Sequence, residues 1–306
     1  MTKQVRHFVR ASIEDSQSRR VMSAPNTPAA TSPASKAVLT SEAVTIDSEC
    51  TGLRWRAENT SILARLIAMM AMGQAAYAAH ILSSLSQAEP KINTAQLRAE
   101  ARIKLTVEEP PKSPRGGYPR WQRDGLIFEA ISWLVARETH PTGLLKAPHV
   151  SATTQGMDGL MIELNAEKTA IVRTTIFEDK CTDHPRSTFL GKVLPEFQKR
   201  HANERSAEII SAAVALIQTA GLDEVTATEF AAAVTNQSLR HYRASFAVEV
   251  DSEAERKKLF ANYNRIANIK AEQRIGATLV VPPKMRNWFD ALANEALIYL
   301  AGLDGA

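Results

Sequence analysis

A pair of apolar segments joined by a short polar turn constrains the fold of this chain more than any other feature. The segments are DGLMIEL (158–164) and TAIVRTTIFEDKC (169–181), and the residues NAEK, 165–168, separate them. Apolar and β-branched runs joined by so short a turn predict a β-hairpin. A further strand is expected just before them, at about 146–153.

The segments on either side of the hairpin alternate between helical and strand patterns. Apolar residues recur at helical spacing after Asp124, which we expect to cap a helix ending near Thr139. Helices are then expected at about 186–201, 204–220 and 226–234, and strands at about 243–250 and 277–282. This order predicts an α/β fold, a mixed sheet flanked by helices.

The first part of the chain has a different composition. Residues 23–41 are rich in Ser, Ala, Pro and Thr, which bury too little apolar surface to offset chain entropy. We therefore expect residues 1–57 to be a mobile segment and linker. Helical patterns run from about 59 to 86 and from about 93 until before Pro110, so 58–110 is expected to be a helical N-terminal unit and 111–306 the main domain.

Charge and cysteine usage narrow the setting. Lysine and arginine total 37 against 33 acids, giving a net charge of +4, which suits a polyanionic partner. Cys50 and Cys181 are the only cysteines, and no apolar run of secretory type is present near the start, so a cytoplasmic location is expected. The apolar stretch 62–82 contains Arg65, and we expect a buried or partner-facing helix there with no membrane partner.

The hairpin carries the candidate chemistry. Glu178 and Lys180 are two residues apart in a strand and so point to the same face. Asp158 lies in GMDG, at the start of the partner strand. With the turn centred near 166 and 167, Asp158 falls opposite about Thr175. A bulge or a skewed register would then be needed to bring Asp158 to Glu178.

Two carboxylates and a lysine in this arrangement are suited to phosphodiester hydrolysis. That reaction needs an activated water, charge neutralisation at phosphorus and a hard cation held by oxygen ligands. Two simpler readings stay open: a surface ion pair between Glu178 and Lys180, and a turn aspartate at 158 that bonds its own backbone.

These residues resemble the PD-(D/E)xK nuclease superfamily, which has the restriction-endonuclease-like fold. The resemblance implies that Asp158, Glu178 and the Asp179 carbonyl bind Mg²⁺ or Mn²⁺ and that Lys180 orients the attacking water. It also implies a catalytic role for Glu129 on the preceding helix. The family's proline before the first acid is replaced by Met157. Glu-x-Lys also occurs at 89–91 and 255–257, but only the triplet at 178–180 ends an apolar strand.

A loop rich in cations and aromatic residues precedes the helix that carries Glu129. Cations and aromatic rings together are typical of segments that grip a phosphate backbone and stack on a base. A solvated connector explains the same composition equally well. The candidate nucleic-acid-binding residues are Lys112, Arg115, Tyr118, Arg120, Trp121 and Arg123.

The expected function is therefore that of a Mg²⁺-dependent DNA endonuclease. The resemblance extends by analogy to effectors of antiviral (anti-phage) defence or restriction, such as the Hachiman system, in which a nuclease works with a helicase or other ATPase. A homo-oligomer is also compatible with the sequence. The alternatives are a non-catalytic nucleic-acid-binding or assembly subunit and a helical interaction module centred on residues 58–106.

Overall fold

The hairpin expected from the sequence lies near one edge of a seven-stranded sheet. The computed structural model describes residues 37–84, 89–149 and 156–305. In it β4 (Gly159–Leu164) pairs antiparallel with β5 (Ile171–Lys180), and the short β3 (Leu144–Leu145) forms the edge beyond β4. The strand order across the sheet is β1-β2-β7-β6-β5-β4-β3.

The centre of the sheet is parallel and its margins are antiparallel. β5, β6 (Arg240–Val248), β7 (Arg274–Val280) and β2 (Thr51–Ala57) run parallel, whereas β1 (Leu39–Val44) is antiparallel to β2. The carboxyl ends of β5, β6 and β7 therefore meet at one edge of the sheet. The mixed α/β sheet predicted from the sequence is confirmed.

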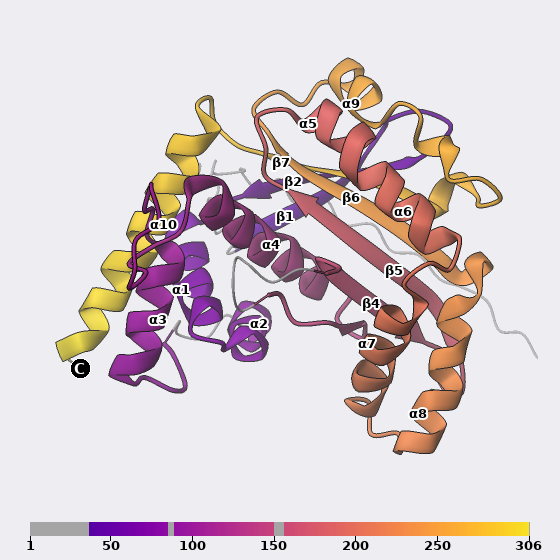
Figure 1. The fold of residues 1–306 in the computed structure, drawn as a ribbon, viewed down its shortest axis with the longest axis horizontal. Helices are drawn as coiled ribbons and strands as arrows, with labels where there is room; N and C mark the ends of the chain where they lie inside the picture. The colour runs from indigo at the N-terminus through magenta and orange to yellow at the C-terminus, as the bar shows by residue number, and fades with distance from the viewer. Residues whose placement is uncertain (1–36, 85–88, 150–155, 306) are drawn as a thin grey trace, which may run out of the picture. The chain divides into compact units, whose positions relative to one another are not determined.

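Two groups of helices cover opposite faces of this sheet (Figure 1). The first group is α1 (Thr60–Ala71), α2 (Ala75–Ser84), α3 (Ala95–Leu105), α4 (Arg120–Thr139) and α10 (Met285–Gly302). The second is α5 (Pro185–Thr188), a π-helical turn Phe189–Val193, α6 (Leu194–His201), α7 (Ser206–Gln218), α8 (Glu224–Ala231) and α9 (Glu253–Phe260). Short 3₁₀ turns lie at Ala232–Thr235, Gln237–Leu239, Tyr263–Arg265, Ala271–Gln273 and Leu303–Gly305.

Each face of the sheet has its own apolar core. Trp55, Phe128 and Phe289 are fully buried on the side of α4 and α10. On the other side Phe189 packs edge-on against Phe246, at a centroid distance of 6.3 Å. A sheet buried on both faces explains why its strands are apolar runs with little alternation.

Residues 39–57 correct the expectation of a mobile segment and linker over 1–57. They form β1 and β2, and the side chain of Trp55 is 0% exposed. This burial outweighs the unfavourable composition just upstream. Residues 1–36 lie outside the described part of the chain. The helices of 58–110 pack with α4 and α10 in one core, so the described residues form a single unit.

The apolar stretch 62–82 is two helices. α1 ends at Ala71, and Gly73 takes a φ of 81°, which turns the chain into α2. Most of the stretch is buried in the core, as expected for a packed helix. Over residues 37–84, 89–149 and 156–305, the helices do not combine the length and apolar character that crossing a bilayer would require.

Four other elements differ from expectation. The strand expected at 146–153 is not formed at 146–149, and 150–155 lie outside the described residues; the strand that pairs with β4 is Leu144–Leu145, just before that range. α4 begins at Arg120, and Asp124 is a buried residue inside it rather than its cap. α9 and α10 were not expected at all.

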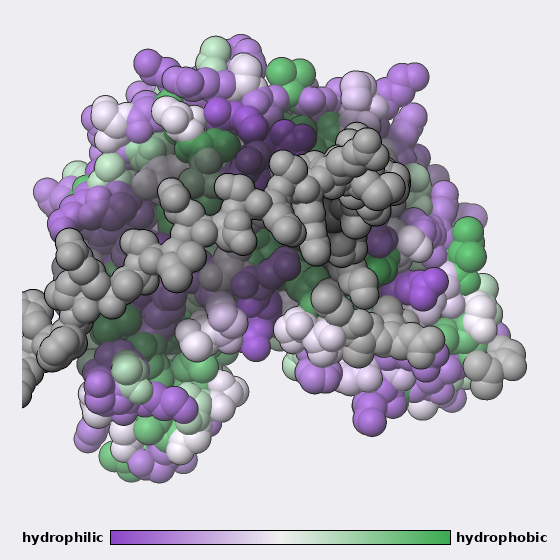
Figure 2. Space-filling view, turned by 180° about the vertical axis from the view of Figure 1, so that it is seen from behind, coloured by the Kyte–Doolittle hydropathy of each residue, from purple (hydrophilic) through white to green (hydrophobic). Residues whose placement is uncertain are grey.

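The exposed large apolar side chains come from separate elements. They include Trp121 in the first turn of α4, Val172 in β5 and Ile298 in α10. Figure 2 shows hydrophobic residues interspersed with hydrophilic ones on the face that it presents. Scattered apolar residues of this kind are ordinary on protein surfaces.

Candidate active site

The register of the hairpin places Asp158 level with Glu178. Gly159 pairs with Phe177 and Met161 with Thr175, with an irregularity at Glu163/Leu164. The expected pairing of Asp158 with about Thr175 is wrong. The connection is longer than NAEK: the Asn165 N–H donates to the Ala170 carbonyl at 3.0 Å, so the turn is centred further along the chain.

Asp158, Glu178 and Lys180 meet at the end of this hairpin. The Lys180 ammonium group contacts Asp158 Oδ2 and lies 2.8 Å from Glu178 Oε2. The main-chain N–H of Asp179 donates to the same Asp158 oxygen at 2.8 Å. Two carboxylates therefore converge on one cation on the same side of the sheet.

The segment that carries Asp158 is fixed by close packing. A Cβ on Gly159 would lie 2.5 Å from a ring carbon of Phe177, so this position fits only glycine. The N–H of Met157, the residue before Asp158, donates to Glu208 Oε1 at 2.9 Å, and the Met157 carbonyl accepts from the Lys146 ammonium at 2.9 Å.

The buried Arg200 in turn holds Glu208, which accepts the Met157 N–H. Arg200 is 0% exposed, and its Nη1 lies 3.3 Å from Glu208 Oε2, while Nη2 lies 3.0 Å from Glu196 Oε1. In the sequence Arg200 stands in the polar run QKRH, which gives no local sign that its side chain is buried.

Burial and like charge shift the ionisation of the site. Glu178 is 5% exposed. Burial and the nearby Asp158 raise the pKa of Glu178 to about 7, although Lys180 pulls it down. Burial opposes protonation of Lys180, but the carboxylates of Asp158 and Glu178 more than offset it, so the pKa of Lys180 lies above its usual value. Lys180 is therefore charged at neutral pH.

Asp179 points to the opposite face of β5. Its Oδ1 lies 3.7 Å from the buried Arg243 guanidinium, and burial raises the pKa of Asp179 to about 6 although Arg243 pulls it down. Arg243 in turn stacks 3.6 Å from the centroid of the Phe177 ring. The side chain of Asp179 is thus structural, whereas its main-chain N–H bonds Asp158.

Asp158 and Lys180 open onto a cleft of about 460 Å³ between α4 and the start of α5. The cleft lies at the carboxyl end of β5, where ligands commonly bind in open α/β sheets. Other side chains that line it include Trp121, Glu129, His149, Lys192 and Arg286.

Glu129 lies in this cleft and is engaged by His149. The His149 N–H donates to Glu129 Oε1 at 2.7 Å, and the ring Nδ1 lies 3.1 Å from Oε2. The Lys146 ammonium lies 3.2 Å from the other ring nitrogen of His149. Both oxygens of Glu129 are thus occupied. Sequence reasoning missed His149 because it assigned residues 146–153 to a strand.

The donor atoms around Lys180 suit a hard cation. Asp158 and Glu178 each supply a carboxylate oxygen there. In the described part of the chain, no group of three or more His, Cys, Asp or Glu side chains is placed to hold a metal ion. A pair of carboxylates is nevertheless a common Mg²⁺ donor set, since that ion keeps several waters and takes oxygens from a phosphate substrate.

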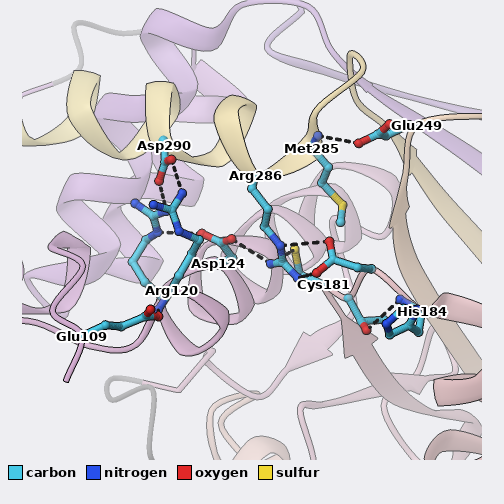
Figure 3. A network of polar contacts seen from close by, with 12 residues as sticks. Glu109, Arg120, Asp124, Cys181, His184, Glu249, Met285, Arg286 and Asp290 are labelled. Carbon is cyan, nitrogen blue, oxygen red and sulfur yellow. Dashed lines mark hydrogen bonds and ion pairs between the residues drawn. The ribbon is translucent and has the colours of Figure 1, made fainter. Parts of the chain in front are cut away.

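The loop residues expected to bind nucleic acid separate into two groups. Arg123 is 2% exposed and pairs with Asp124 at 2.7 Å and with Asp290, which also pairs with Arg120 (Figure 3). Two carboxylates hold Arg123 inside the α4–α10 interface, so the expectation that it contacts nucleic acid is wrong. Arg120 remains 41% exposed at its side chain.

The other loop residues lie outside the interface between α4 and α10. Lys112 and Arg115 are exposed, and the Arg115 guanidinium lies 4.6 Å from the ring centroid of Tyr118, which is mostly buried. Trp121 is 63% exposed, and it is the one of the six that lines the cleft.

Comparison with known proteins adds no relative to this geometry: no protein-family model matches the chain, and neither the curated proteins nor the solved structures gave a significant match.

Proposed function

We propose that this protein is a metal-dependent nuclease that hydrolyses phosphodiester bonds of DNA. The observation that carries the proposal is the contact of the Lys180 ammonium group with the carboxylates of both Asp158 and Glu178, beside a cleft that Asp158 and Lys180 line. Burial and the neighbouring Asp158 raise the pKa of Glu178, and a carboxyl group shifted by burial and a nearby like charge is typical of a functional site.

The proposal includes membership of the PD-(D/E)xK superfamily with its restriction-endonuclease-like fold. It is supported by a mixed sheet in which the antiparallel hairpin β4–β5 continues into parallel β6, with α4 packed against β5. Further support comes from the acid just before β4 and the acid and lysine at the end of β5, which meet at one end of the hairpin.

Asp158, Glu178 and the Asp179 carbonyl would hold Mg²⁺ or Mn²⁺. When bound, the ion supplies charge neutralisation at phosphorus and acidifies the attacking water. The surroundings of Glu178 fit this role, because a divalent cation offsets both the burial and the repulsion from Asp158 that raise the pKa of Glu178.

The chain's own groups account for the rest of the reaction. Lys180 keeps its proton at neutral pH and donates hydrogen bonds to the attacking water and to the phosphate oxygens, where negative charge builds in the transition state. The hydrogen bond from the Asp179 N–H keeps Asp158 aimed at the same point. Glu129 holds the segment at His149, which forms one wall of the cleft.

The biological setting is proposed by analogy alone. A nuclease of this kind would act on foreign DNA in phage defence, with a helicase or other ATPase to present the strand. The net charge of +4 is compatible with a DNA substrate.

Plasmid cleavage tests the proposal. Wild type, Lys180→Met and Lys270→Met are incubated with supercoiled DNA, with Mg²⁺ and with chelator; Lys270 is a matched control because its side chain is 79% exposed and lies outside the cleft. We expect Mg²⁺-dependent cleavage by wild type and Lys270→Met, and a loss of at least about a hundredfold in Lys180→Met. Equal cleavage by Lys180→Met contradicts the proposal. DNA binding by wild type without cleavage favours the non-catalytic alternative.

A further inference from the structure

Arg286, on the first turn of α10, reaches into the candidate active-site cleft. Its Nη1 donates to Asp124 Oδ2 at 2.8 Å, and its Nε and Nη2 donate to the two carboxylate oxygens of Asp183 at 3.1 and 3.0 Å (Figure 3). A contact of 3.6 Å to the sulfur of Cys181 places it beside the end of β5.

The two acids that hold Arg286 differ in their surroundings. The side chain of Asp124 is 0% exposed and pairs also with Arg123 at 2.7 Å, so it is a fixed anchor. The side chain of Asp183 is 61% exposed and lies in the loop between β5 and α5. Asp183 is therefore the partner that another anion can replace at little cost.

A phosphate group would bind Arg286 with the same geometry as the Asp183 carboxylate. Two guanidinium nitrogens face two oxygens in parallel, which is the bidentate arrangement that arginine forms equally with carboxylate and phosphate. The hydrogen bonds from Arg286 hold the pKa of Asp183 below its usual value, so the loop presents a permanent anion there.

The position of this pair relates it to the nuclease site. Asp183 follows Lys180 by three residues, and both Asp183 and Arg286 line the cleft that contains Asp158. A phosphodiester chain with one phosphate at Lys180 would present its neighbouring phosphates to the walls of the same cleft.

A second cleft of about 640 Å³ adjoins the first and shares Thr182 and Asp183 with it. The Asp183–Arg286 pair thus lies where the two clefts meet.

We propose that Arg286 binds a backbone phosphate next to the one that is cleaved, and that Asp183 occupies this position as a competing anion until substrate arrives. This inference rests on the proposed nuclease function and adds a substrate contact to it. Arg286 exchanges Asp183 for phosphate while Asp124 keeps the guanidinium in place.

The test is equilibrium binding of a fluorescent DNA oligonucleotide in chelator, where no cleavage occurs, over a series of salt concentrations. The variants are Asp183→Asn, Arg286→Gln, Arg286→Lys and Arg265→Gln; Arg265 is an exposed control that lines neither cleft. Removing one phosphate contact lowers the slope of affinity against salt by about 0.9 for duplex DNA and about 0.7 for single strands.

We expect Arg286→Gln to bind roughly tenfold more weakly with a reduced salt slope, because a charge-assisted bidentate contact is lost. Arg286→Lys should fall between the two, since it keeps the charge without the fork. Asp183→Asn should bind at least about threefold more tightly, because the competing anion is gone. This last variant removes an exposed side chain and tests the proposal even if Arg286→Gln fails to fold.

Two results overturn the inference: an Arg286→Gln curve that matches Arg265→Gln, or an Asp183→Asn protein that binds no more tightly than wild type. Cleavage by wild type alongside either result leaves the nuclease function standing and removes only the phosphate contact. A wild type that neither binds nor cleaves DNA removes both.

Discussion

The carboxylate of Asp158 accepts a hydrogen bond of 2.8 Å from the main-chain N–H of Asp179, the residue between Glu178 and Lys180. One acid is thereby tied to the backbone of the strand that supplies the other acid and the lysine. The three side chains are positioned by a single hairpin rather than by separate elements that have to dock.

The hydrogen bond between Asp158 and Asp179 allows the charge of Asp158 and its structural role to be tested separately. Asp158→Asn retains an oxygen that can accept the Asp179 N–H but carries no charge, so we expect it to fold with nearly wild-type stability and to lose at least about a hundredfold in cleavage rate. Asp158→Ala also leaves a buried N–H without its partner and should cost about 1–3 kcal/mol of unfolding free energy. Thermal unfolding and single-turnover cleavage measure the two effects. Full activity in Asp158→Asn would contradict the assigned role.

Glu178 should make stability depend on pH in an unusual direction. Its pKa of about 7 in the folded protein lies above the ordinary value of 4.5, so the folded state holds a proton that the unfolded state has released. Stability is therefore lost as pH rises between these values. The measurement compares the unfolding free energies of Glu178→Gln and wild type, in chelator, across this range of pH. We expect the difference in favour of Glu178→Gln to grow by up to about 3 kcal/mol between about pH 5 and about pH 8.

Glu163, in the same hairpin, provides a control of opposite sign. The hydrogen bond to His140 holds the pKa of Glu163 below its usual value, so its contribution is present above the unfolded pKa and is lost on acidification. Glu163→Gln should therefore lose more stability at neutral pH than in acid. Parallel pH profiles for the two variants would argue against the burial of Glu178.

Arg123 should contribute to the stability of the fold and not to substrate binding. Removing it leaves the buried Asp124 with Arg286 alone and Asp290 with Arg120 alone, so Arg123→Met is expected to cost about 3–5 kcal/mol. Lys112→Met, at an exposed position in the same loop, should change stability by less than about 0.5 kcal/mol. Chemical denaturation compares the two; equal stabilities would contradict the structural role of Arg123.

Trp121 is the loop residue placed to contact a base. Its indole is 63% exposed at the cleft, so we expect Trp121→Ala to weaken binding of single-stranded DNA by about 1–3 kcal/mol, and Trp121→Phe to weaken it less. Val225→Ala, an exposed apolar change on α8, serves as the control. An unchanged affinity in Trp121→Ala would exclude base stacking at this position.

The hairpin was predictable because its signal is local. Apolar runs on either side of NAEK and an acid two residues before a lysine required no knowledge of the rest of the chain. Its register was not, because the main-chain N–H groups of Thr169 and Ala170 donate hydrogen bonds to Asn165 Oδ1 and lengthen the connection. A shift of a few residues decided whether Asp158 reaches Glu178.

The strands β1 and β2 could not be predicted from the local sequence. β1 follows a Pro- and Ser-rich stretch, and β2 gains its place by pairing with β7, more than two hundred residues away. A local pattern cannot report such a partner. The same limit applies to Arg123 and Arg286, since surface and buried arginines look alike until the acids of a distant helix are placed beside them.

Cation binding tests the central claim most directly. Titration of Mn²⁺ into wild type, Glu178→Gln, Asp158→Asn and Lys180→Met, followed by calorimetry, should show that either acid variant loses affinity while Lys180→Met binds at least as tightly as wild type, because its ammonium no longer competes for the two carboxylates. The same Lys180→Met protein should not cleave DNA. Wild type that binds no Mn²⁺, or binding that is unchanged when Asp158 and Glu178 are neutralised, would contradict the account.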